Sequence, residues 1–416
     1  MSADRQVFLD AALSIGRRLC RDAVWSNGQC NWLGWAMEPH GGQWVCVHRG
    51  MGSLLYDGSP GIGLYLGRLA RVSGDSIIRA TAEAALAQAL SASTSLEATG
   101  EYGFYSGLSG IAWACREAGR ELAHGGLMAR GHAAMRCAAR LPPRKDRLDI
   151  INGSAGLIPA LLDAAQRDSG EEFLLAAICH GEHLLSLAAR GEQGWSWDTL
   201  GVPGERPLLG FAHGTSGIAW ALAKLSAATG RADFLAAAKA ALAYERAHFR
   251  PAQGNWPDLR SFVQSSSTGE PPCMLAWCHG APGIGFARLA LSALLPDEPS
   301  VLEEAETAIR TTAAGLDVGT GNFSLCHGDG GNADLLVQAA ETLARPELRQ
   351  IAETAGARAL ERFEASGMPW SCGVPGAGET PNLMLGTAGI GYFLLRLYDA
   401  RQFPTPLLPA AGQTGD

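Results

Sequence analysis

The chain has 416 residues, of which 47% are hydrophobic and 18% are charged, and its formal net charge is −8. This length is enough to bury a large core, either as one big domain or as two ordinary ones. Because the acidic balance provides no excess of Lys and Arg to neutralise a phosphate backbone, the composition argues against nucleic acid as a partner.

The sequence also argues against a membrane protein. No uninterrupted apolar stretch approaches the roughly 18 residues that a membrane span needs. No apolar segment of the kind found in signal peptides follows the N-terminal Met1-Ser-Ala-Asp-Arg-Gln. Ten cysteines in such a chain favour thiols and metal ligands over a disulfide framework. We therefore expect a cytoplasmic protein.

The first predicted element is an amphipathic helix over Gln6–Ala23, and an irregular segment is expected over residues 25–56. Next comes a short apolar helix from Gly61 to Ala70, which stops at Ser73-Gly74-Asp75. A second helix, from Ile77 to Leu90, carries polar residues at helical spacing. The apolar helix is expected to be buried and the amphipathic helix to lie outside it.

This helical hairpin repeats along the chain. The motif Gly-x-x-Gly followed by an apolar run recurs at intervals of 46 to 66 residues, which marks a repeated supersecondary unit. The fourth unit, for example, has an apolar helix from Gly217 to Leu225, a break at Gly230 and an amphipathic helix from Ala232 to Phe249. The seven motifs lie at Gly58–Gly61, Gly107–Gly110, Gly153–Gly156, Gly214–Gly217, Gly280–Gly283, Gly328–Gly331 and Gly386–Gly389.

The count of helices predicts a closed arrangement. Seven apolar helices are followed by only six amphipathic ones, because the chain ends soon after Leu397. The N-terminal helix within residues 1–24 would supply the seventh and close the ring beside the last apolar helix. We therefore predict an all-α fold, a single-domain α/α toroid over residues 1–416 with seven inner and seven outer helices. Residues 405–416 are expected to form a disordered tail.

The loops that precede the glycines contain the residues that could bind a metal or take part in catalysis. Two of them set a thiol beside an imidazole, in Cys278-His279 and Cys326-His327. Because these are corresponding loops of a repeat, they should lie on one rim of the toroid, together with Asp57, Asp149 and His213. Cysteine thiolate and imidazole are preferred zinc ligands, and three protein ligands leave a fourth position open.

These residue types predict one zinc ion per chain, bound by Cys278, Cys326 and His327. His279 could replace one of these ligands, since it is also adjacent to a thiol. Otherwise His279, together with Trp277 and Asp57, is expected to support the site or to face the substrate.

The remaining cysteines and histidines are expected to be structural, because buried residues of these types are more often part of the core than ligands. A second metal site in the segment after the first helix is the alternative for some of them. The residues concerned are Cys30, Cys46, His40 and His48.

The motifs resemble those of the LanC-like lanthionine cyclases, most closely the cyclase domain at the C-terminus of class II lanthipeptide synthetases. The resemblance runs from about residue 10 to 400, and the paired Cys-His-Gly segments are its most specific part. It implies a seven-fold double α-barrel with a central zinc. The matching segments begin Leu55-Tyr-Asp-Gly, Phe211-Ala-His-Gly, Trp277-Cys-His-Gly, Leu325-Cys-His-Gly and Leu383-Met-Leu-Gly.

The resemblance also implies a reaction. The family adds cysteine thiols of a dehydrated precursor peptide to dehydroalanine or dehydrobutyrine, which closes lanthionine or methyllanthionine rings. By motif, Cys278, Cys326 and His327 resemble the zinc ligands. His213 matches the rim histidine that stabilises or protonates the enolate, and Asp149 matches an aspartate that orients or deprotonates.

Two departures from the family pattern affect these expectations. Class II synthetases carry a dehydratase domain ahead of the cyclase, and no such segment precedes the first repeat in this sequence. We therefore expect a separate dehydratase or kinase/lyase enzyme as a partner. Some stand-alone cyclases have an arginine four residues before the first zinc cysteine, where this chain has Met274.

Three other functions compete with that of a cyclase. The main one is a LanC-like protein that binds or adds peptide or glutathione without forming rings. A zinc prenyltransferase β-subunit would lack the paired Cys-His-Gly loops. A carbohydrate-active toroid could use Asp57 and Asp149 as paired carboxylates, but it would have no use for the zinc ligands.

Overall fold

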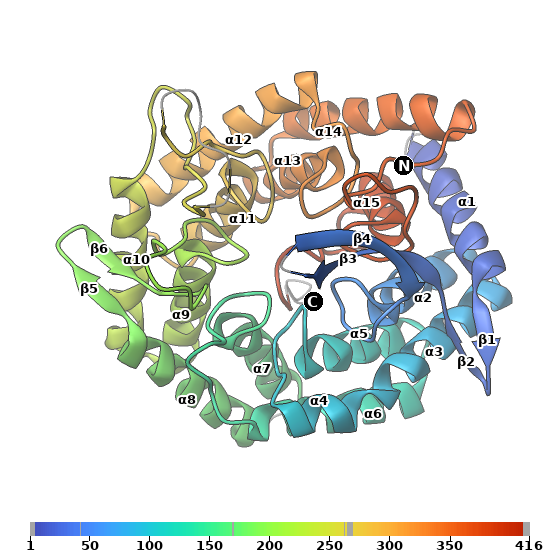
Figure 1. Ribbon diagram of the computed structural model, residues 1–416, viewed down its shortest axis with the longest axis horizontal. Coiled ribbons are helices and arrows are strands. Elements are labelled where there is room, and N and C mark those ends of the chain that lie inside the picture. Colours follow the sequence, from blue (N-terminus) through green and yellow to red (C-terminus); the bar gives the residue numbers. More distant parts are fainter. Residues whose placement is uncertain (1–4, 42, 169, 262, 264–268, 411–416) are drawn as a thin grey trace. The chain divides into compact units, whose positions relative to one another are not determined.

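The computed structural model describes residues 5–41, 43–168, 170–261, 263 and 269–410 (Figure 1). Within these residues the chain is predominantly helical, so the predicted all-α class is confirmed. The described helices include none with the length and apolar character needed to cross a membrane.

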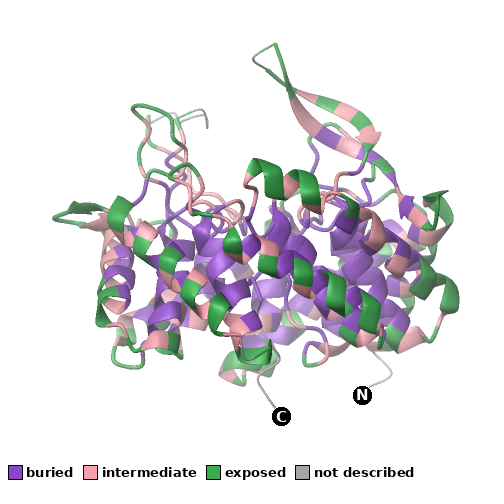
Figure 2. Cartoon of the chain, turned by 90° about the horizontal axis from the view of Figure 1, so that it is seen from below, coloured by how far each residue is buried: buried purple, intermediate pink, exposed green. Residues whose placement is uncertain are grey.

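Seven buried helices each begin at one of the Gly-x-x-Gly motifs. Nearly every side chain in the first two-thirds of such a helix is buried, whereas the helices that alternate with them have one exposed face (Figure 2). The buried helices are α2 (Ser59–Ser73), α5 (Leu108–Glu121), α7 (Ser154–Asp168), α9 (Thr215–Thr229), α11 (Ala281–Ser292), α13 (Asp329–Leu343) and α15 (Thr387–Asp399).

Seven amphipathic helices alternate with the buried ones along the described chain. The short helix α4 (Ser93–Thr99) follows the second of them, and a π-helical turn, η2 (Leu360–Ala365), extends the last. The amphipathic helices are α1 (Gln6–Asp22), α3 (Ser76–Ser91), α6 (Gly125–Arg140), α8 (Glu171–Leu187), α10 (Ala232–Ala247), α12 (Pro299–Val318) and α14 (Pro346–Ala359).

The second glycine of the motif is required for a steric reason. In α11, a Cβ atom on Gly283 would overlap with the carbonyl oxygen of Trp277, six residues earlier. Only glycine lets the first turn of the helix pack directly on the loop that leads into it. The same close approach recurs for Gly61 on Leu55, Gly156 on Ile150, Gly217 on Phe211, Gly331 on Leu325 and Gly389 on Leu383.

The described chain groups into two compact units. The first comprises Met1–Thr99, Ser106–Cys137 and Gly319–Thr405, and the second comprises Gly100–Tyr105, Ala138–Val318 and Pro406–Asp416. The first unit therefore contains α1 to α5, most of α6, and α13 to α15, and the second contains α7 to α12.

In the first unit, the N-terminal helix α1 packs against the last buried helix, α15, and also contacts α2 and α3. Its inward face consists of buried apolar residues, among them Phe8, Ile15 and Leu19. The hydroxyl of Tyr65, on α2, donates a hydrogen bond of 2.5 Å to the carbonyl of Ala12. An ion pair of 2.9 Å joins Arg18 to Glu364 of η2. Elements from the two ends of the chain thus form one packed cluster.

The expectation of an irregular segment over residues 25–56 was wrong. Two antiparallel hairpins occupy most of it, β1 (Val24–Ser26) with β2 (Gln29–Asn31) and β3 (Leu33–His40) with β4 (Gln43–Gly50). The first turn contains Asn27 and Gly28 with φ of 48° and 74°, which is the Asn-Gly signature of a tight hairpin. Val45 and Val47 supply the β-branched residues that favour an extended strand.

The expectation of a disordered tail was also wrong for the part of it that is described. In the second unit, Leu407 is fully buried. The carbonyls of Pro406 and Leu407 accept hydrogen bonds from Tyr105 Oη (2.6 Å) and Trp277 Nε1 (2.9 Å). Apolar side chains and backbone acceptors therefore bind this segment to the core. Residues 411–416 lie outside the described residues.

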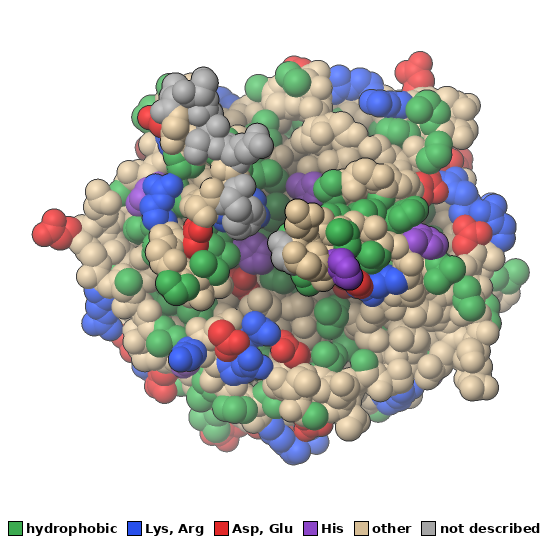
Figure 3. All heavy atoms as spheres, in the orientation of Figure 1, with side chains coloured by type: hydrophobic (Ala, Val, Ile, Leu, Met, Phe, Trp, Pro, Cys, Tyr) green, Lys and Arg blue, Asp and Glu red, His purple; other side chains and the backbone are tan. Residues whose placement is uncertain are grey.

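Charged side chains of both signs are scattered over the face that Figure 3 shows, and no broad basic patch gathers there. The mixed charges on this face agree with the acidic net charge of −8.

Candidate functional site

The loop before α11 carries Cys278 and His279 and is fixed by backbone contacts in the second unit. Gly280 has a φ of 92°, and a Cβ atom there would overlap with the carbonyl oxygen of Met274. The amide of Ala281 donates a hydrogen bond of 2.8 Å to the side-chain oxygen of Asn255. Because this turn tolerates only glycine, the position of the preceding thiol is set by the backbone.

A histidine–aspartate pair lies in two other loops of the same unit. Nδ1 of His213, before α9, is 2.6 Å from Oδ2 of Asp149, before α7. Asp149 is only 2% exposed, and its other oxygen accepts a hydrogen bond of 2.9 Å from the amide of Asn152. About a third of the His213 side chain (36%) is exposed. The carboxylate therefore orients the imidazole, which leaves Nε2 as the nitrogen that can exchange a proton.

The surroundings of His213 raise its pKa. Burial lowers the pKa, but the neighbouring carboxylate of Asp149 raises it by charge and by hydrogen bonding, Cys278 adds to the increase, and the net shift is upward. A larger fraction of this imidazole is consequently protonated near neutral pH than for an ordinary histidine. His213 is thus suited to donate a proton.

His279 has a different environment from His213, although the two rings stack with centroids 6.0 Å apart and an interplanar angle of 27°. It is only 2% exposed, and its Nδ1 lies 3.9 Å from Oδ1 of Asp258. Burial, together with the charge of Arg260, lowers the pKa of His279. This imidazole is therefore neutral at neutral pH, beside a histidine that holds its proton more firmly.

Asp258 and Arg260 were not predicted from the sequence. Arg260 binds both carboxylate oxygens of Asp258, with Nη2 2.6 Å from Oδ2 and Nε 3.0 Å from Oδ1. Nη2 also lies 3.7 Å from Sδ of Met274. Neither residue belongs to a repeat motif, so their only signal in the sequence is a charged pair two residues apart.

The loop before α13, in the first unit, carries Cys326 and His327. The amide of Cys326 donates a hydrogen bond of 2.9 Å to the carbonyl of Met384. Asn322 contacts the His327 carbonyl at 3.3 Å. Nε2 of His327 is 2.8 Å from the carbonyl oxygen of Gly373. Because a carbonyl only accepts, this contact places the proton on Nε2 and leaves the Nδ1 lone pair available for a metal.

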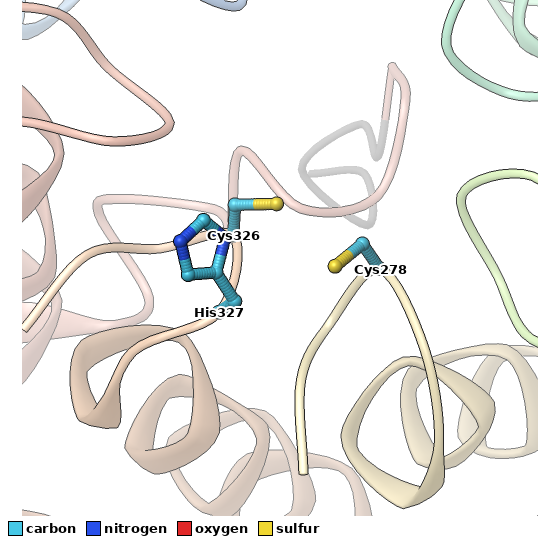
Figure 4. Close-up of side chains that lie close together, drawn as sticks. All are labelled: Cys278, Cys326 and His327. Carbon is cyan, nitrogen blue, oxygen red and sulfur yellow. The ribbon is translucent and has the colours of Figure 1, made fainter. Parts of the chain in front are cut away.

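Cys278, Cys326 and His327 each offer one ligand atom, and these three atoms lie within 4.8 Å of one another. The two thiol side chains in Figure 4 point toward each other, with the imidazole beside them. Cys326 is buried, whereas Cys278 and His327 are half-buried. This group is a possible metal site with two sulfur donors and one nitrogen donor.

Among the residues that the structure describes, no second group of three such side chains is found. The alternative metal site around Cys30 and Cys46 therefore has no support. The thiol of Cys30 instead lies 3.4 Å from the carbonyl of Thr81, and His48 packs on the ring of Trp35 at 4.8 Å.

The other two predicted site residues, Trp277 and Asp57, are not members of this group of ligands. Trp277 has no exposed surface, and its ring packs edge-on against Tyr105 at 5.2 Å. Its buried ring can therefore hold the backbone next to Cys278 in place, but it cannot face a substrate. Asp57 precedes α2 and pairs with Arg49 of β4 at 3.7 Å. Burial raises the pKa of Asp57, and the charge of Arg49 offsets part of this increase.

Comparison with known proteins bears on both the fold and the family. The sequence pattern of the family described as lanthionine synthetase C-like protein matches residues 51–408. No curated protein matches the chain.

Among solved structures, nisin cyclase is 18% identical, with a TM-score of 0.60 over 85% of this chain and 90% of its own. At this identity the likeness shows the fold, and it confirms the predicted helical toroid.

Two carbohydrate-active enzymes are more weakly similar. An unsaturated glucuronyl hydrolase specific for heparin has a TM-score of 0.47 at 14% identity, over 75% of this chain and 84% of its own. Cellobiose 2-epimerase from Spirochaeta thermophila has a TM-score of 0.45 at 13% identity, over 97% and 99%.

Proposed function

The chain belongs to the lanthionine synthetase C-like family, and from this membership and the site described above we propose that it is a zinc-dependent lanthipeptide cyclase. It would join peptide cysteine thiols to dehydroalanine or dehydrobutyrine residues, which closes (methyl)lanthionine rings. The observation that carries the proposal is the combination of a Cys/Cys/His donor set with a histidine–aspartate pair whose histidine has a raised pKa.

The donor set fits zinc. The three ligand atoms lie within 4.8 Å of one another, within reach of a single ion whose bonds to sulfur and nitrogen are about 2.0–2.3 Å long. The contact from His327 Nε2 to the Gly373 carbonyl supplies the outer partner that orients a ligating histidine. We propose Cys278, Cys326 and His327 as the ligands of one zinc ion per chain. When bound, zinc lowers the pKa of a thiol at its open position.

The chain's own residues would serve the addition itself. The sulfur of the substrate thiolate forms a bond to the β-carbon, and the electron pair of the C=C bond moves onto the α-carbon and its carbonyl oxygen. Nε2 of His213 then delivers a proton to the α-carbon, while Asp149 keeps the ring oriented and its pKa raised. The proton that the substrate thiol has lost is thereby restored, so the reaction is balanced without an oxidant or reductant.

The partners follow from this chemistry. The substrate is a precursor peptide with dehydrated serine or threonine residues, and a separate dehydratase or kinase/lyase would prepare it. None of the ten cysteines of the chain is in a disulfide, which supports a reducing compartment such as the cytoplasm.

The direct test is to incubate the protein with a dehydrated, cysteine-containing peptide and to count alkylatable thiols over time. Loss of thiols without a change in peptide mass indicates ring formation. The alternative, a protein that binds peptide or adds glutathione without closing rings, predicts constant peptide thiols or a mass increase of one glutathione. Constant thiols with unchanged peptide mass at full zinc occupancy would reject the cyclase proposal.

Asp149→Asn is expected to change the pH dependence of ring formation. The protonated form of His213 is the active acid, and the Asp149 charge raises its pKa. Without that charge the pKa falls, so the alkaline limb of kcat/KM should move to lower pH and the rate at neutral pH should drop. A general acid typically raises the reaction rate about 10²–10⁴-fold. His213→Ala should therefore lower the rate of ring formation by that factor at every pH.

Both variants should keep their zinc, because neither residue is a proposed ligand. The measurement is a pH profile of thiol loss for wild type and both variants, each with its zinc content. An unshifted alkaline limb in Asp149→Asn would contradict the role of the pair. Loss of zinc from His213→Ala would make His213 a ligand instead.

A further inference from the structure

The guanidinium group of Arg260 is held at the candidate active site by a buried carboxylate. Asp258 has no exposed side-chain surface, whereas 21% of the Arg260 side chain is exposed. Burial raises the pKa of Asp258, but the hydrogen bonds from Arg260 and the charge of its guanidinium group contribute to a net decrease, so the carboxylate is ionised. A bidentate pair of this kind fixes the plane of the guanidinium.

The same carboxylate connects Arg260 to the two histidines of the site. Oδ1 of Asp258 lies 3.9 Å from His279 Nδ1, and the His279 ring stacks on that of His213. The charge of Arg260 lowers the pKa of both imidazoles, so its field reaches the nitrogen proposed to move the proton. These four residues all belong to the second unit, and His279 directly follows Cys278 in the chain.

The proposed reaction needs a positive group at this place. When the sulfur bonds to the β-carbon, negative charge develops on the carbonyl oxygen of the dehydrated residue. Fixed donors that face such an oxygen stabilise the transition state more than the ground state. Arginine suits this role because it stays protonated and remains planar, and here it is oriented before substrate arrives.

We propose that Arg260 binds the carbonyl oxygen of the dehydroamino acid and stabilises its negative charge during thiol addition. Arg260 keeps all its protons throughout, and His213 delivers the proton to the α-carbon. Asp258 is a positioning residue that holds the guanidinium in its plane. This inference rests on the proposed cyclase function.

The test compares Arg260→Gln and Arg260→Lys with the matched control Arg250→Gln. Arg250 lies in the same segment, has a similarly exposed side chain (22%), and pairs with Glu270 at 3.3 Å. Both Arg260 variants keep a hydrogen-bond donor for Asp258, which limits the cost of leaving that carboxylate buried without a partner. The measurements are kcat and KM for thiol loss on a dehydrated peptide, zinc content and the thermal transition.

For Arg260→Gln we expect kcat to fall by about 10²–10³-fold, the usual loss for one donor to a developing oxyanion, with a smaller loss for Arg260→Lys. KM, zinc content and melting should stay close to wild type, and the Arg250→Gln control should cyclise normally.

Several results would overturn the inference. A wild-type rate in Arg260→Gln would remove Arg260 from the reaction. A loss of rate that follows zinc content or melting would make the residue structural. If wild type itself closes no rings, the proposed function fails and this inference fails with it, whereas an active wild type with an equally active Arg260→Gln rejects the inference alone.

Discussion

Cys278→Ala and Cys326→Ala are each expected to lose most of the bound zinc and, with it, ring formation. Each change removes one of two sulfur donors from a group whose ligand atoms lie within 4.8 Å of one another. Without the metal, the substrate thiol keeps its ordinary pKa of about 8.5, so only a few per cent is thiolate near pH 7. His327→Ala should behave in the same way, because it removes the nitrogen donor.

Cys273→Ala is a matched control for the two cysteine variants. Cys273 is close in sequence to Cys278, but its thiol contacts Gln253 at 3.9 Å and it is not part of the group of ligands. This variant should retain about one zinc per chain by elemental analysis and cyclise normally. Full zinc retention in the double variant Cys278→Ala/Cys326→Ala would reject the site.

Deletion of residues 1–22 should leave a molten or aggregating protein rather than a folded enzyme with altered specificity. The deletion removes α1, whose buried residues include Phe8, Leu9, Ile15 and Leu19. Each large apolar side chain contributes about 1.5–3 kcal/mol on full burial, and the loss would also expose apolar surface on α2 and α15. The free energy lost is therefore a large part of the usual total of about 5–15 kcal/mol.

A point substitution tests the same interface without truncation. A Cβ atom on Gly16 would overlap with a side-chain methyl of Leu69, on α2, so Gly16→Leu should lower the thermal midpoint sharply. Asp10→Ala, at an exposed position of the same helix, is the control and should melt like wild type. A truncated protein that stays monomeric, melts cooperatively near the full-length temperature and binds zinc would contradict the structural role of α1.

The buried helices could be predicted from the sequence because each begins with the same constraint. A glycine must follow six residues after the carbonyl that it packs on, as Gly283 does after Trp277. That close approach is observed at six of the seven motifs, and it shows directly in the sequence as Gly-x-x-Gly. The boundaries were also close, since the helix predicted over Ile77–Leu90 is observed over Ser76–Ser91.

The hairpins and the C-terminal segment were missed for a different reason. Asn27-Gly28 was a readable turn signal, but it lay outside the repeat that guided the prediction. The packing of Leu407 depends on a hydrogen bond from Trp277, 130 positions away in sequence, and no local pattern encodes that contact. Tertiary partners rather than propensity decide the structure of such segments.

The sequence predicted only those candidate site residues that lie in the loops before the repeated glycines. His213, His279 and His327 occupy corresponding positions, and the sequence alone left open which of the two beside a cysteine would be a ligand. The two differ in the structure, because His327 offers a ring nitrogen within 4.8 Å of both thiols, whereas His279 is not part of that group. Asp258 and Arg260 lie in a connection without repeat character, so only the folded chain brings them to the histidines.

The contact of the second motif glycine with the carbonyl six residues earlier has a consequence for how such a site can change. The anchor is backbone to backbone, so the two residues between that carbonyl and the first glycine can differ without disturbing the helix start. Those two residues are Tyr56-Asp57 in one loop, Ala212-His213 in another and Cys278-His279 in a third. The two residues before the first glycine of each motif are thus equivalent positions on a common backbone. Evolution or protein engineering can exchange the reactive side chains there one loop at a time.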